Sequence, residues 1–125
     1  MKIFILLIML FCHIVDDYYL QGLLAKLKQK SWWETNAPDE LYKYDYIIAL
    51  LEHAFSWTFM IMLAPIVLLV INNTVNIIVF FIIFLTNWLI HTIVDDAKAN
   101  RHSINLITDQ LIHIAQIIIT WIILV

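Results

Sequence analysis

Four long apolar stretches follow one another along the chain, separated by shorter polar segments. They cover approximately residues 3–24, 45–71, 77–97 and 104–125. A helix needs about 20 mainly apolar residues to cross a membrane, and each stretch reaches that length. Apolar and polar residues do not alternate within the stretches, and a backbone inside lipid must satisfy its own hydrogen bonds. The pattern therefore predicts an all-α protein, a four-transmembrane-helix bundle forming a single integral membrane domain over residues 1–125, with Ser103 as a helix N-cap.

Composition agrees with a membrane protein and excludes several other classes. Hydrophobic residues make up 63% of the chain and charged residues 14%, whereas soluble domains are usually about 45–50% apolar. The sequence has no basic patch large enough to follow a phosphate backbone, so we expect no nucleic-acid partner. One cysteine excludes an intrachain disulfide. The expected partners are membrane lipid and a small or lipid-like substrate, and a homo-oligomer stays open.

The cations are distributed unevenly between the two ends of the predicted helices. The segments 25–44 and 98–103 lie on the same side, and that side holds all but one of the lysines and the arginine: Lys26, Lys28, Lys30, Lys43, Lys98 and Arg101. Lys2 stands alone on the other side. Positively charged loops stay in the cytoplasm. We therefore expect both segments in the cytoplasm, both termini outside, and the chain in the cell (inner) membrane.

Polar residues interrupt every apolar stretch. They are His13, Asp16, Asp17, Gln21, Glu52, His53, His91, Asp95, Asp96, Asp109, Gln110 and His113. A charge at the centre of a membrane helix costs about 2.5–3.5 kcal/mol even on lenient insertion scales. Such carboxylates must be neutralised by protons, partners, water or a bound cation.

The spacing of these residues favours a metal ion. Three His/Asp pairs are four residues apart, so the members of each pair share a helix face: His13 with Asp17, His91 with Asp95, and Asp109 with His113. Two ligands at this spacing form the metal-binding helix of zinc peptidases. At 1.5 Å per residue the pairs and His53 lie at a similar depth, on the order of 10–14 Å from the cytoplasmic loops. The predicted metal ligands are His13, Asp17, His53, His91, Asp95, Asp109 and His113.

A weak internal repeat narrows the choice among the aspartates. The segment from His13 to Asp17 is similar to that from His91 to Asp95, and a carboxylate–histidine element follows on the next helix each time. This suggests two pseudo-symmetric helical hairpins with facing polar surfaces. Aligning the histidines pairs Asp17 with Asp95, which favours these two over Asp16 and Asp96 as ligands. Asp16 and Asp96 stay open as ligands, bases or structural residues.

The donor types limit the metal and suggest the chemistry. Histidine and aspartate without thiolate suit zinc, with manganese or iron as alternatives, and the number of candidates allows one or two ions. Two bridged ions would suit hydrolysis. Glu52 is a candidate catalytic base. Alternatively, it contacts a metal ligand without binding the metal, or it faces the loop. Lys98 is a candidate catalytic residue that stabilises an anionic substrate group, or it only extends towards the membrane surface.

The same residues resemble the pattern of a family of small prokaryotic and phage membrane proteins known as a domain of unknown function. That pattern reads HxxxDFxLQ, an isolated helix-two His, HxxxDxxK and DQxxH. Its counterparts here are His13 to Gln21, His53, His91 to Lys98, and Asp109 to His113, with Tyr18 in place of the usual Phe. The layout is also similar to membrane-bound metal-dependent hydrolases, a resemblance that implies metal and hydrolysis without naming a substrate.

The sequence thus favours an intramembrane metal-dependent hydrolase, with zinc as the expected metal. It would act from the cytoplasmic side on a lipid, lipid-linked or phosphorylated substrate. The first alternative is a metal or proton transporter using the same residues as a pathway. Against it, residues 60–69, 79–85 and 117–125 offer almost no polar side chains apart from Thr120. The second alternative is a non-enzymatic phage membrane effector.

Overall fold

The computed structural model describes residues 1–72 and 75–125, so part of the polar segment between the second and third predicted helices lies outside the described residues. Four long helices dominate it: α1 (Lys2–Val15), α4 (Asp45–Asn72), α5 (Ile77–Ala99) and α6 (Leu106–Leu124). Shorter elements are η1 (Asp16–Leu20), α2 (Leu24–Leu27), α3 (Lys30–Asn36) and η2 (Glu40–Tyr42). No strand occurs in the described ranges, so the predicted all-α class is confirmed.

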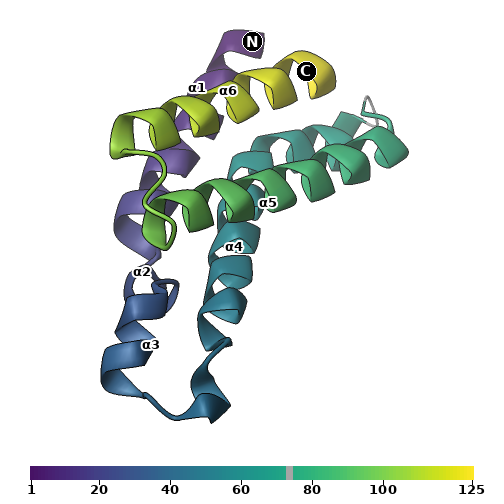
Figure 1. Cartoon of the computed structure of the whole chain (residues 1–125). Coiled ribbons are helices and arrows are strands. Elements are labelled where there is room, and N and C mark those ends of the chain that lie inside the picture. Colours follow the sequence, from purple (N-terminus) through teal and green to yellow (C-terminus); the bar gives the residue numbers. More distant parts are fainter. Residues whose placement is uncertain (73–74) are drawn as a thin grey trace.

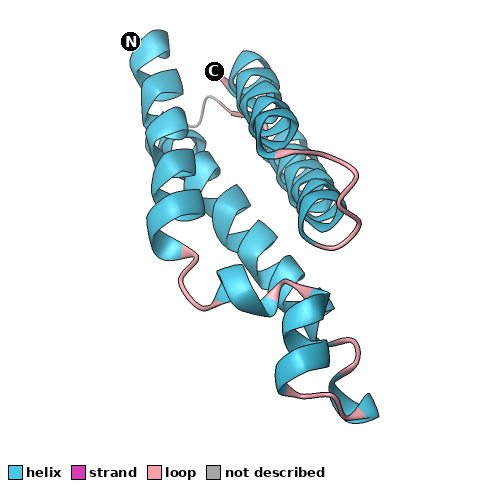
Figure 2. Cartoon of the chain, turned by 60° about the vertical axis from the view of Figure 1, so that its left-hand side comes forward, coloured by secondary structure: helices cyan, strands magenta, loops and turns pink. Residues whose placement is uncertain are grey.

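The four long helices form a closed ring. Each packs against two others, in the order α1, α4, α5, α6 and back to α1. Figure 1 shows α2 and α3 below this bundle, between α1 and the start of α4. In Figure 2, α1 and α4 lie on the left and α5 and α6 on the right, as two neighbouring pairs. The ring leaves an interior that side chains from all four helices can reach.

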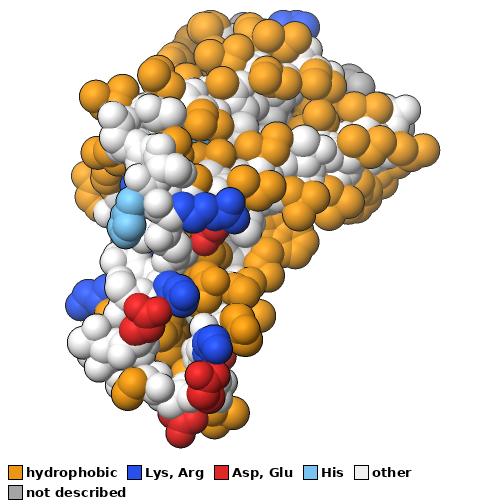
Figure 3. Space-filling model, viewed as in Figure 1, with side chains coloured by type: hydrophobic (Ala, Val, Ile, Leu, Met, Phe, Trp, Pro, Cys, Tyr) orange, Lys and Arg blue, Asp and Glu red, His pale blue; other side chains and the backbone are white. Residues whose placement is uncertain are grey.

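The outside of the bundle is apolar and part of its inside is polar, which is the reverse of a soluble protein. Large hydrophobic side chains cover most of the face seen in Figure 3, while charged groups gather at the lower end. The four long helices, α1 together with η1, are long and apolar enough to cross a membrane. One end of the interior is filled by an apolar cluster that includes Met9, Trp57, Ile61, Phe80 and Ile117.

The first membrane helix ends earlier than the predicted range of 3–24. It continues from α1 through one π-helical turn, η1, and stops at Leu20. Gly22 follows with φ +47°, a left-handed conformation that costs other L-residues about 1–2 kcal/mol. Because Gly22 ends the helix there, the chain turns into the short helix α2, which carries Lys28 to the base of the bundle.

The last helix begins two residues later than the predicted range of 104–125, and its N-cap is not Ser103. Asn105 is the N-cap, and its side chain accepts a hydrogen bond from the backbone N–H of Thr108. Ser103 instead donates to the carbonyl of Ala97, near the end of α5. Asparagine is as good an N-cap as serine, so the sequence alone could not separate the two positions.

Candidate metal centre

The structure brings the seven predicted ligands into one buried region. None exposes more than 8% of its surface, and they come from α1, η1, α4, α5 and α6: His13, Asp17, His53, His91, Asp95, Asp109 and His113. Five of them form two groups whose donor atoms lie close enough to share a metal ion. Asp17, His53 and His91 form the first group, and His91, Asp95 and His113 form the second. His91 belongs to both groups, so the two candidate positions are adjacent.

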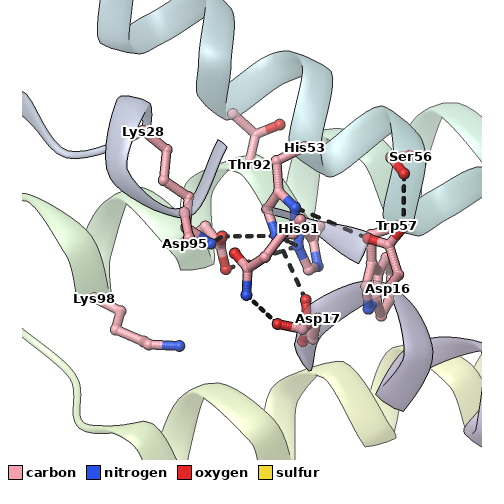
Figure 4. A network of polar contacts seen from close by, with 12 residues as sticks. Asp16, Asp17, Lys28, His53, Ser56, Trp57, His91, Thr92, Asp95 and Lys98 are labelled. Carbon is pink, nitrogen blue, oxygen red and sulfur yellow. Dashed lines mark hydrogen bonds and ion pairs between the residues drawn. The ribbon is translucent and has the colours of Figure 1, made fainter. Parts of the chain in front are cut away.

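Asp95 lies at the junction of these groups. Its Oδ2 lies 3.2 Å from Nε2 of His53. Its Oδ1 faces the other way, 3.7 Å from Nε2 of His91 and 3.5 Å from Nε2 of His113. One carboxylate therefore faces three histidines on three different helices; Figure 4 shows it beside His53 and His91.

The distances among the donor atoms fit a small transition metal. The Nε2 atoms of His53 and His91 are 3.3 Å apart, and Nε2 of His53 is 3.4 Å from Oδ1 of Asp17. A tetrahedral ion with bonds of about 2.0–2.1 Å holds its ligand atoms about 3.3–3.4 Å apart. Two of the three donor pairs in the first group therefore have the spacing of such a site.

Hydrogen bonds orient His113 towards the cluster. Gln116 donates through its amide nitrogen to the backbone and side-chain oxygens of Asn87, which directs its own Oε1 to Nδ1 of His113 at 3.2 Å. Since Oε1 only accepts, Nδ1 carries a proton, and in the neutral ring Nε2 then has the free lone pair. That lone pair faces Asp95 and Asp109. Metal-binding histidines are usually oriented in this way.

Asp16 lies behind His53 without a hydrogen bond to it in the described structure. Its Oδ1 accepts a hydrogen bond of 2.6 Å from Ser56, and its Oδ2 lies 3.8 Å from Nδ1 of His53 (Figure 4). A carboxylate that accepts a hydrogen bond from a histidine directs the opposite ring nitrogen to a metal, and Asp16 lies close to that position. Asp16 thus lies behind a candidate ligand, while Asp17 faces the interior of the cluster.

Several buried polar atoms of the cluster have no hydrogen-bond partner in the described structure. They include Nδ1 of His53, Nδ1 of His91, Oδ1 of Asp109 and Nε2 of His113. A buried polar atom left without a partner costs about 1–3 kcal/mol. Two of these atoms, on Asp109 and His113, face each other across 3.4 Å. A cation between them would satisfy both, so the residues present fit a metal ion.

Charge leads to the same conclusion. Four buried carboxylates surround the cluster: Asp16, Asp17, Asp95 and Asp109. Two lysines reach them, Lys28 at 2.6 Å from Asp95 and Lys98 at 2.7 Å from Asp109. Among the described residues this leaves two more carboxylates than lysines at the cluster. Buried charges must be paired or must coordinate a metal, and one divalent ion would balance the difference.

His13 contacts the cluster in a different way from the other histidines. The indole N–H of Trp57 donates to its Nδ1 at 2.8 Å. Its Nε2 then carries the proton and donates to Oε1 of Gln110 at 3.1 Å. Both ring nitrogens are therefore engaged, and His13 lies beside the two metal groups. Asp109, held by Lys98 and Gln110, also borders them.

The two predicted catalytic residues lie in different places. Lys98 reaches the cluster through Asp109. Glu52 is exposed and lies against Ile48, Leu51, Phe55 and Trp88 on the surface of the bundle. The structure does not bring Glu52 to the cluster, because adjacent residues of a helix point about 100° apart and His53 takes the inward position. Asp96 also lies outside it, where it accepts hydrogen bonds from Asn100 and Arg101.

Sequence reasoning missed three residues that shape the site. The sequence groups Lys28 with the cytoplasmic cations, yet it is buried against Asp95. Trp57 is fully buried and stacks on His91 with ring centroids 4.2 Å apart. Gln116 is the third such residue. For Lys28, the sequence offers one indication of its buried position. Gly22, the single glycine of the chain, marks the turn that returns Lys28 to the bundle.

Comparisons of the chain with protein-family models, with curated proteins and with solved structures found no match.

Replacing Gln116 with Leu is expected to weaken metal binding about 10- to 100-fold. The variant removes the acceptor that fixes the proton on Nδ1 of His113, and loss of such partners has effects of this size. Competition with a coloured chelator measures the affinity. Thr58→Val is the matched control, because Thr58 is buried and its hydroxyl has no partner in the described structure. Equal affinity in both variants would contradict the role assigned to Gln116.

Proposed function

We propose that this chain is an intramembrane metal-dependent hydrolase. The observation that carries the proposal is the pair of adjacent metal-binding groups that share His91 and are linked by Asp95. Adjacent ions joined by a carboxylate suit hydrolysis of phosphoesters and amides. The setting is a bundle of four helices that can each cross a membrane, so the proposed substrate is a lipid, a lipid-linked group or a phosphorylated group.

Five residues would hold the metal: Asp17, His53, His91, Asp95 and His113. We propose zinc, as one or two ions, because the donors are imidazole and carboxylate; manganese or iron would accept the same set. Bound there, the metal would act as a Lewis acid and supply an activated water. Zinc sites of catalytic type keep one position open, and three protein donors leave room for it. Because the two groups share His91, a second ion would be held by only the other two residues of its group.

Residues at the edge of the cluster would handle the substrate. His13 donates through Nε2 to Gln110, whose own amide donates to Asp109 at 3.0 Å and to Asp17 at 3.4 Å. This chain of hydrogen bonds orients the Gln110 amide and the two carboxylates at the edge of the site. The Lys98 ammonium, with its side chain 34% exposed, is placed to stabilise an anionic group.

The orientation of the protein belongs to the same proposal. The end of the bundle with η1, α2 and the segment 100–105 carries the loops rich in lysine and arginine. By the positive-inside rule this end faces the cytoplasm and both termini lie outside. The cluster lies towards that end, because an apolar core that includes Met9, Phe80 and Ile117 fills the opposite one. A substrate would therefore reach the site from the cytoplasmic half of the membrane.

A metal or proton pathway is a second candidate function, favoured by one observation. Buried polar side chains continue from His113 through Gln116 and Asn87 to Thr120, where Asn87 donates to the hydroxyl at 2.7 Å. One turn beyond Thr120 along α6, Leu124 belongs to the apolar core. Flux of metal or protons through the protein reconstituted in sealed vesicles would establish this transport function. Absence of flux would favour a site that opens to one side of the membrane only.

The test of the hydrolase is product release by the purified protein in lipid–detergent micelles. Phospholipids and lipid phosphates serve as substrates, and mass spectrometry identifies the products. We expect hydrolysis that stops after chelation and returns when zinc or manganese is added. Asp17→Asn should lower the rate by at least about 100-fold, since it removes a metal-binding carboxylate, while His102→Ala, in the α5–α6 loop, should not. Hydrolysis that persists after complete metal removal would contradict the proposal.

A further inference from the structure

A groove runs between α1 and α6 on the surface of the bundle. It has a volume of about 570 Å³, and the two helices lie together in Figure 1. Its lining is mainly apolar, formed by Leu10, His13, Ile14, Tyr18, Tyr19, Gln110 and Ile114. Both helices can cross a membrane, so within a bilayer this groove faces lipid.

The polar part of the groove is connected to the candidate metal centre. His13 and Gln110 are hydrogen-bonded to each other, and Gln110 donates to Asp17 and Asp109. His13 is 3% exposed and Asp109 is fully buried. The groove therefore reaches the cluster through two polar side chains, whereas its other walls offer only aliphatic and tyrosine surface.

The cytoplasmic end of the groove carries the groups expected at a lipid–water boundary. Tyr18 and Tyr19 are 56% and 77% exposed, and tyrosine is enriched where the acyl region meets the head groups. Lys98 shares one oxygen of Asp109 with Gln110, which places its ammonium next to the amide that lines the groove. Lys98 does not itself line the groove. An apolar groove whose polar end adjoins an ammonium matches a lipid with an acyl chain and a phosphate.

We propose that the groove between α1 and α6 binds a bilayer phospholipid, with one acyl chain along Leu10, Ile14 and Ile114 and the phosphate near Lys98. The head group then lies beside His13 and Gln110, at the edge of the metal groups. Only the identification of this lipid as the substrate rests on the proposed hydrolase function. Binding itself requires neither metal nor turnover.

The test uses the full chain reconstituted in phosphatidylcholine vesicles that contain a phosphatidylglycerol with a photoreactive diazirine in its acyl chain. After illumination, mass spectrometry maps the labelled residues. We expect label on the groove residues of α1 and α6. In Ile14→Trp the indole fills the groove, and displacing about two methylenes should lower groove labelling about tenfold. Ile8→Trp is the control, because Ile8 is on the same helix, has nearly the same exposure (49% against 48%) and does not line the groove.

The outcomes separate this proposal from the hydrolase. Equal labelling in Ile14→Trp and Ile8→Trp, or label spread evenly over the lipid-facing surface, would overturn the groove as a binding site even if the protein hydrolyses lipids. Groove-specific label in a protein without metal would uphold the groove and count against the hydrolase. A diacylglycerol with the same diazirine chain should label the groove more weakly than the phosphatidylglycerol, and equal labelling would refute the place given to the phosphate.

Discussion

His91→Phe is expected to abolish stoichiometric metal binding and to weaken metal affinity by more than about 100-fold. His91 is the one residue common to both metal-binding groups, so its loss affects both positions at once. Loss of a residue that only hydrogen-bonds to a metal ligand weakens metal binding about 10- to 100-fold. Loss of a ligand common to both groups should weaken it more. Elemental analysis of the purified variant, followed by chelator competition, gives the measurement.

Phenylalanine is chosen so that packing is retained. The imidazole of His91 stacks between Trp57 and His113, with centroid separations of 4.2 and 4.1 Å, and a phenyl ring keeps that stacking. His102→Ala serves as the control, since His102 is an exposed loop histidine that the groups do not include. Metal content equal to the unmodified protein in His91→Phe would show that the metal does not bind at this cluster.

The second large effect concerns stability, because Asp95 and Lys28 form a buried ion pair. Asp95→Asn leaves the ammonium of Lys28, which lies 2.6 Å from the carboxylate, without its anionic partner. Removing one member of a buried pair costs about 3–5 kcal/mol. We therefore expect the metal-free variant to lose that much free energy of unfolding, measured by denaturant titration in detergent.

A second substitution separates the lost pair from a general loss of packing. Lys28→Met in addition to Asp95→Asn removes the unpaired cation, and replacing both members of a buried pair is often neutral. The double variant should therefore regain most of the lost stability while still binding metal weakly. Lys26→Met, an exposed lysine on the same short helix, should not rescue Asp95→Asn. Rescue by both lysine substitutions, or by neither, would contradict the Lys28–Asp95 pair.

The four long apolar helices and the convergence of the candidate ligands could be predicted for clear physical reasons. A length of about 20 apolar residues is a strong constraint, and antiparallel helices bring residues at equal distances from their loops to equal depth. His91 and Asp95 are four residues apart, so they necessarily share a face of α5. These rules were sufficient to bring His53 and His113 to the same interior.

The other features of the site depend on how each helix is rotated about its axis and on where the chain turns. Glu52 and His53 are adjacent, so the sequence does not determine which of the two side chains points inward. The structure places Glu52 on the surface. His13 has the same i,i+4 spacing as His91, yet Trp57 and Gln110 occupy both of its ring nitrogens. Contacts of this kind join residues far apart in the chain, and no periodicity encodes them. The contact of Lys28 with Asp95 could not be predicted for the same reason.

Whether the buried cluster of histidines and aspartates binds a transition metal can be seen in crystals of the protein purified without chelator and supplied with zinc. Data are collected on both sides of the zinc absorption edge. We expect anomalous difference density within bonding distance of Nε2 of His53 and His91, or of Nε2 of His113 and Oδ1 of Asp95. Ordered side chains at these positions with no anomalous peak among them would contradict metal binding by this cluster.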